Sequence, residues 1–100
     1  MKKLCISLGL GMLLGTAAHA DLALAKAKNC VDCHSVNSPL VGPSFKDIAA
    51  RYAGQPGMVD KLAHTIIHGG PQDQMDVMPA NPQVSEAEAR QLAAWILGLK

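Results

Sequence analysis

The stretch that decides the fold is CVDCH, residues 30–34, in which Cys30 and Cys33 enclose two residues and His34 follows at once. Two thiols and an imidazole this close together are typical of four kinds of site: a disulfide, a zinc centre, a redox-active dithiol or a covalently attached haem. The surrounding sequence favours one of these four over the others.

The segment before the motif has the pattern of a secretory signal peptide. A basic start precedes an uncharged apolar run that ends in Ala18-His19-Ala20, the small-x-small pattern of a cleavage site. The run is shorter than the roughly 20 apolar residues that cross a bilayer, and glycines interrupt it. We therefore predict a secretory signal peptide over residues 1–20 and a single domain over residues 21–100, exported to the periplasm.

The predicted domain needs more than its own apolar core. Its seven basic and eight acidic residues leave a net charge of −1, which gives no electrostatic reason to expect nucleic acid or an anionic membrane as a partner. A chain this short buries only about 60–65% of its unfolded surface. A metal, a cofactor or disulfides should supplement the core, and we expect a monomer with no stable membrane insertion.

Glycine and proline punctuation separates four predicted helices, and no stretch alternates as a strand would. Two of the helices begin with a capping pattern, Ser44 with Asp47 and Ser85 with Glu88. The predicted helices span approximately residues 21–29, 44–53, 58–68 and 85–100.

Three of the four interpretations of CVDCH are weak in this context. A disulfide between Cys30 and Cys33 would close too small a loop to stabilise the chain, and a redox dithiol normally accompanies strands. Zinc needs a fourth ligand, which His64 or His68 could supply; both fall on the polar face of their predicted helix, which weakens the zinc interpretation. In an exported protein C-x-x-C-H predicts one covalent haem c, with thioethers at both cysteines and His34 on the iron.

The second axial ligand has several candidates in the sequence. Met58 falls on an apolar helix stripe and is expected to be core, whereas His64 and His68 fall on a polar face and are expected to be solvated. Met75 and Met78 remain as candidates. Met78 is preferred because Pro79 restrains its backbone and Met75 has polar neighbours, but Met75 stays open.

These residues resemble a known group, the small bacterial class I cytochromes c of the cytochrome c-551/c-552 type. The resemblance rests on CVDCH, on LVGPSFKDIAARYAG (residues 40–54) and on MPANPQVSEAEARQLAAWILGLK (residues 78–100). It implies an all-α cytochrome c fold, with four short helices packed around one covalently bound haem c. The matching positions imply haem attachment at Cys30 and Cys33 and axial ligation by His34 and Met78.

The resemblance also implies supporting roles and shows one departure. Pro43 matches the proline whose carbonyl accepts the N–H of the proximal histidine, and Trp95 matches an aromatic residue that packs near the haem. Family members usually carry a tryptophan and a Pro-Met-Pro-Pro run before the last helix. Here the loop reads QMDVMPANP, residues 74–82, so a hydrogen bond from that tryptophan to a haem propionate is lost or replaced.

The expected function is a soluble periplasmic electron carrier rather than an enzyme. The resemblance implies redox partner proteins, with a quinol-oxidising complex or another donor on one side and a terminal oxidase, nitrite reductase or peroxidase as acceptor. Two other hypotheses stay open. A ligand-binding or peroxidatic haem protein would follow if the loop methionine did not hold the iron, and a zinc or dithiol module would follow if no haem were bound.

Overall fold

Four α-helices and one 3₁₀ turn make up this computed structural model, which describes residues 17–70 and 77–100, with side chains from residue 21 onward. The helices are α1 (Ala17–Ala27), α2 (Phe45–Tyr52), α3 (Met58–His68) and α4 (Glu86–Leu97), and the turn η2 is Cys30–Asp32. Within these residues there is no strand, only two isolated β-bridges. The predicted all-α class is confirmed.

The helix boundaries agree with the local signals, except at the first helix. Ser44 caps α2 by accepting a hydrogen bond from the Asp47 backbone N–H at 3.0 Å. Ser85 and Glu88 form the complete capping box of α4, at 3.0 and 3.1 Å. The prediction for the first helix was wrong at its start, because the chain is already helical at Ala17, where the described residues begin, rather than only from near Asp21.

The expected start of α1 rested on the cleavage pattern and on Asp21, an acid that suits the positive end of a helix dipole. The alanines before Asp21 favour helix, so the helical backbone continues through them. Its other end is defined by Asn29, which lies in the left-handed region at φ 68° and turns the chain into η2.

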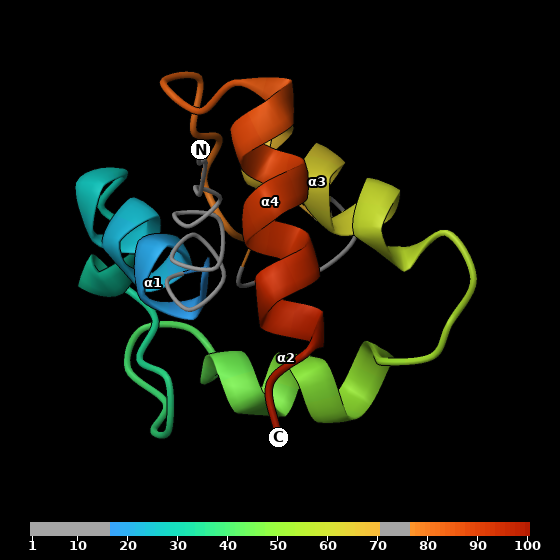
Figure 1. Ribbon diagram of the computed structural model, residues 1–100. Coiled ribbons are helices and arrows are strands. Elements are labelled where there is room, and N and C mark those ends of the chain that lie inside the picture. Colours follow the sequence, from blue (N-terminus) through green and yellow to red (C-terminus); the bar gives the residue numbers. More distant parts are fainter. Residues whose placement is uncertain (1–16, 71–76) are drawn as a thin grey trace, which may run out of the picture.

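Helix α4 lies at the centre of the fold and packs against α1, α2 and α3 (Figure 1). Half of the ten buried hydrophobic residues in the described part of the chain are alanines, which allow neighbouring helices to pack closely. Buried Ala89 and Ala93 on α4 are fully covered, and Leu92 is 1% exposed. The main core cluster consists of Ala25, Ala63, Ile66, Val84, Ala89 and Leu92.

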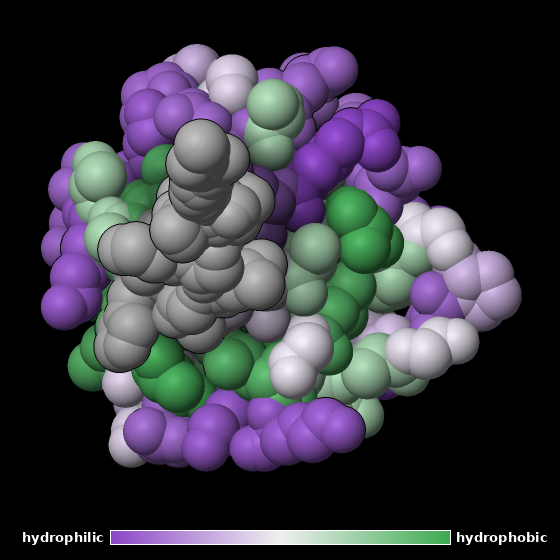
Figure 2. Space-filling model, viewed as in Figure 1, coloured by the Kyte–Doolittle hydropathy of each residue, from purple (hydrophilic) through white to green (hydrophobic). Residues whose placement is uncertain are grey.

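Polar side chains cover the outer helix surfaces. Figure 2 shows hydrophilic residues along the lower edge, over α2, and at the top, around the start of α4, with hydrophobic residues between them. Lys28 joins the end of α1 to α4 through an ion pair with Glu88 at 3.3 Å. None of the described helices is long and apolar enough to cross a bilayer.

Candidate functional site

The CVDCH motif forms a single tight turn that opens onto a cavity. The backbone N–H groups of Cys33 and His34 both donate to the carbonyl of Cys30, at 3.2 and 3.0 Å. In a 3₁₀ turn side chains three apart eclipse each other, so Cys30 and Cys33 lie on the same side. Both thiols are half-buried and no disulfide joins them.

The surroundings of the thiols do not suit zinc or dithiol chemistry. Burial raises the pKa of the Cys30 thiol, and a backbone hydrogen bond only partly opposes this effect. A raised pKa keeps the thiol protonated, whereas zinc binding and disulfide exchange use the thiolate. Across residues 21–70 and 77–100, no group of three or more His, Cys, Asp or Glu side chains could hold a metal ion.

His34 is held in one orientation by contacts on several sides. The ring is 8% exposed, and its Nδ1 lies 2.7 Å from the carbonyl oxygen of Pro43. Because a carbonyl can only accept, Nδ1 carries the proton and Nε2 keeps its lone pair for a metal. The ring stacks on Phe45 with centroids 5.3 Å apart, and Phe45 meets Trp95 edge-on at 5.4 Å.

Gly42 closes the remaining side of the His34 ring. A Cβ atom at this glycine would lie 2.6 Å from Cε1 and 3.0 Å from Nδ1 of the imidazole. The Gly42 backbone cannot easily retreat, because its N–H donates to the Cys33 carbonyl at 2.8 Å. The loop after the motif therefore packs its backbone directly against the ring.

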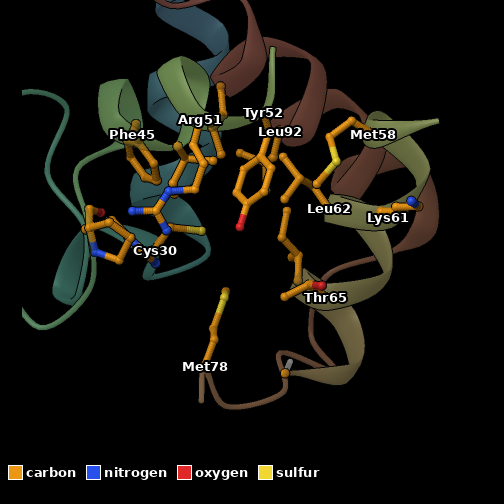
Figure 3. Close-up of a pocket in the computed structure, with 16 residues that line it drawn as sticks. Cys30, Phe45, Arg51, Tyr52, Met58, Lys61, Leu62, Thr65, Met78 and Leu92 are labelled. Carbon is orange, nitrogen blue, oxygen red and sulfur yellow. The ribbon is translucent and has the colours of Figure 1, made fainter. Parts of the chain in front are cut away.

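Met78 approaches the same cavity from the connection between α3 and α4. Figure 3 shows its thioether pointing into the cavity. Its backbone pairs with Gly70 through two hydrogen bonds, at 3.0 and 3.3 Å. Gly69, at φ 83°, is needed beside it, because a Cβ there would lie 2.8 Å from the Met78 carbonyl oxygen. The other candidate, Met75, lies outside the described residues.

Asn81 anchors the segment that carries Met78 to the end of α3. Its side-chain Nδ2 donates to the carbonyls of Ile66 at 2.9 Å and Pro79 at 3.2 Å. Its backbone N–H donates to the carbonyls of Ile66 and Ile67. These bonds satisfy carbonyls that the helix end leaves unpaired, so one residue both caps α3 and holds the methionine segment in place.

The cavity itself has a volume of about 360 Å³, within the range of about 300–1,000 Å³ usual for small-molecule and cofactor sites. Met58 lines the cavity. His64 and His68 do not line it, and their expected exposure to solvent is confirmed. The lining residues are Cys30, His34, Pro43, Phe45, Ile48, Arg51, Tyr52, Met58, Lys61, Leu62, Thr65, Ile66, Gly70, Met78, Leu92 and Ile96.

Comparison with known proteins decides the family. The sequence model of the family described as Cytochrome c matches residues 22–100. The chain belongs to the cytochrome c family. It is 53% identical to cytochrome c-551 of Azotobacter vinelandii over 75 residues, which is 74% of this chain and 90% of that protein. Cytochrome c-552 of Hydrogenobacter thermophilus is 42% identical and matches over the full length of both chains.

The cytochrome also shares its fold with a solved relative. The crystal structure of wild-type Nitrosomonas europaea cytochrome c552 superposes with a TM-score of 0.72 at 47% identity, covering 79% of this chain and 99% of that one. The predicted c-551/c-552 type and cytochrome c fold are thus confirmed. The protein is a small electron-carrier haem protein with one covalently attached haem c, and it is not an enzyme.

The residues around the cavity fit haem c. Cys30 lines the cavity, and Cys33, which does not line it, lies on the same turn. His34 presents Nε2 to the cavity and Met78 presents a sulfur. The other walls are mostly apolar, as a porphyrin requires. Two polar groups also point into the cavity, the guanidinium of Arg51 and the hydroxyl of Tyr52 (Figure 3). The Arg51 guanidinium is a cation and can therefore pair with the propionate carboxylates of a haem.

Sequence reasoning did not identify Asn81 or Arg51 as part of this site. Arg51 follows Ile48 by three positions on α2, so helical spacing alone places it at the border of the apolar face. Asn81 offers no such signal, because the α3 carbonyls to which it donates, those of Ile67 and Ile66, are 14 and 15 residues away.

Proposed function

We propose that this cytochrome is a periplasmic carrier of single electrons, with haem c joined to Cys30 and Cys33 and its iron held between His34 and Met78. The observation that supports this most directly is the contact between His34 and Pro43. A 2.7 Å hydrogen bond to a backbone carbonyl leaves only Nε2 available for a metal. Met78 supplies a second donor to the same cavity.

Haem c, when bound, supplies an iron that changes between the ferric and ferrous states, and a methionine ligand raises its potential. The chain contributes rigidity: the Pro43 carbonyl, Phe45 and Gly42 hold the imidazole in one orientation. Asn81 does the same for the methionine segment. Two fixed ligands leave no coordination position for an outside molecule, which favours electron transfer over ligand binding.

Arg51 is our candidate for the role of the tryptophan that related cytochromes carry in the loop before the last helix. Trp95 is the single tryptophan of the sequence, and it lies on α4 against Phe45. Arg51 lines the cavity from α2, beside Tyr52. A guanidinium can form two parallel hydrogen bonds to one carboxylate, so it can replace an indole N–H as partner of a haem propionate.

The surface around the cavity supports short-lived docking of redox proteins. Leu40 is 58% exposed, Val41 84% and Val77 40%. Leu40 and Val41 precede the glycine that touches His34, and Val77 precedes Met78, so all three adjoin the segments that would hold the haem. Small contacts with an apolar centre suit weak redox encounters. We propose a quinol-oxidising complex as donor and a terminal oxidase, nitrite reductase or peroxidase as acceptor.

Export rests on the sequence of residues 1–20, with cleavage after Ala20 and a mature domain over residues 21–100. The test is the N-terminal sequence of the haem-containing protein isolated from the periplasmic fraction. A mature protein beginning at Asp21 is expected. Recovery of the haem protein from the cytoplasm with an intact N-terminus would contradict the proposal.

The decisive experiment on the ligands is Met78→Ala in the haem-loaded protein. We expect haem to stay attached, the ferric iron–methionine charge-transfer band to disappear, and the potential to fall. Met58→Leu is the matched control, because Met58 also lines the cavity but should leave the band unchanged. Retention of the band in Met78→Ala together with its loss in Met75→Ala would move the assignment to Met75.

A test with carbon monoxide separates the carrier from a ligand-binding haem protein. The reduced wild-type protein should not bind carbon monoxide at neutral pH, whereas Met78→Ala should bind it readily. Rapid stoichiometric binding by the wild type would show an open iron site and would contradict the carrier function.

A further inference from the structure

Two histidines lie together on the surface of α3, outside the haem cavity. His64 and His68 are both exposed, and their ring centroids are 4.4 Å apart with the planes tilted by 40°. They are one helical turn apart, the spacing at which side chains on a helix meet. Neither is used by the electron-carrier site, since neither lines the cavity.

The pair borders a small polar hollow between α3 and the start of α4. This hollow has a volume of about 120 Å³ and is lined by Asp60, Ala63, His64, Ile67, His68, Glu86 and Arg90. Asp60 and Arg90 form an ion pair across the two helices, so their charges offset each other. Glu86, in the first turn of α4, adds a negative charge beside the imidazoles.

We propose that His64 and His68 form a surface site for a divalent transition-metal ion of the kind that prefers imidazole, namely Zn²⁺, Ni²⁺ or Cu²⁺. Neutral imidazole nitrogens are good ligands for these ions, and affinity rises toward Cu²⁺. Two rings in contact already lie close to the arrangement in which both can bind one ion. The described residues place no third His, Cys, Asp or Glu within ligand distance, so water completes the coordination.

The surrounding charges favour such a cation near neutral pH. The groups that face the rings are Asp60 and Arg90, which are paired, and Glu86, which leaves a net negative charge in the hollow. Metal and protons compete for the same nitrogens, since an imidazolium has no lone pair. Binding should therefore weaken as the solution is made acidic, because protons displace the metal from the imidazole nitrogens.

The test is calorimetric titration of the oxidised, haem-loaded mature protein with Zn²⁺, which does not change the redox state of the iron. The wild type should bind one Zn²⁺ per pair of histidines. His64→Ala and His68→Ala should each weaken binding by at least about tenfold, since loss of even an indirect ligand contact costs about 10–100-fold. Both residues are exposed, so both variants should fold, and the haem spectrum checks this.

A matched control keeps the number of histidines but separates the pair. His68→Ala combined with Gln91→His moves one imidazole to the part of α4 where Gln91 bonds with Asp21, outside the hollow. This double variant should bind Zn²⁺ as weakly as His68→Ala alone. The proposal would be overturned if the double variant bound Zn²⁺ as tightly as the wild type. It would also be overturned if the wild type bound Zn²⁺ no more tightly than His64→Ala does.

Discussion

Replacement of Gly42 by alanine tests whether the loop backbone positions the proximal histidine. The added Cβ would lie 2.6 Å from Cε1, 3.0 Å from Nδ1 and 3.2 Å from Nε2 of His34. Carbon atoms pack at about 3.5–4.0 Å, so the shortfall is roughly 1 Å. The backbone of Gly42 is not in the left-handed region, so the effect arises from the clash alone.

Either the ring or the loop must move to relieve this clash. Movement of the ring disturbs its 2.7 Å bond to the Pro43 carbonyl and its stacking on Phe45. Movement of the loop stretches the 2.8 Å bond from the Gly42 N–H to Cys33. Overpacking of this kind costs about 1–3 kcal/mol in stability, and for a domain of this size about 4–8 °C of melting temperature is lost per kcal/mol.

The assay is thermal unfolding of the haem-loaded Gly42→Ala variant, together with its ferric spectrum and its potential. We expect a lower melting temperature and a shift in potential, because the imidazole no longer keeps its orientation and hydrogen bond. Gly98→Ala is the matched control, since the nearest atoms to a Cβ there lie at 3.5 and 3.6 Å. The reasoning fails if Gly42→Ala unfolds at the same temperature as Gly98→Ala and has the same potential as the wild type.

Three further outcomes follow from the same contacts. Asn81→Ala removes three side-chain hydrogen bonds, two donated to the Ile66 and Pro79 carbonyls and one accepted from Gln83. It should lower stability by about 1–3 kcal/mol and speed carbon monoxide binding by the reduced protein; unchanged binding would show that Asn81 does not hold the methionine segment. Ser85→Ala should cost about 1 kcal/mol in denaturant unfolding. The Ser85 backbone N–H, and then Lys28, lower the pKa of Glu88, so the carboxylate half of the capping box contributes above the ordinary value of 4.5 and its stabilisation is lost as the pH falls below it. Ser85→Ala keeps this backbone N–H, so its penalty should change little in acid, whereas the penalty of Glu88→Ala should shrink. Arg51→Gln should lower the potential, because a cation near the iron favours the ferrous form, whereas Lys46→Gln, outside the cavity, should leave it unchanged.

The helices were predictable because their signals are local. A capping serine acts on a backbone N–H three residues away, and an apolar stripe repeats every three or four residues, so both can be recognised in the sequence. Helix α3 was predicted at its observed bounds, Met58–His68, and both serine caps are present. The start of α1 was wrong because Asp21, an acid that suits a helix N-terminus, lies inside the helix and not at its start.

The candidate site likewise has some features that local sequence determines and others that depend on tertiary structure. The sequence by itself determined the CVDCH turn, the haem chemistry that such a turn implies, and a restrained methionine at position 78, because each depends on neighbours in the chain. Only the tertiary structure decided that Gly42 touches the His34 ring, that Asn81 closes the end of α3, and that Arg51 faces the cavity. Each of these contacts depends on where the packed helices and the loop after CVDCH place their side chains and backbone groups, and no periodicity or spacing in the sequence encodes it.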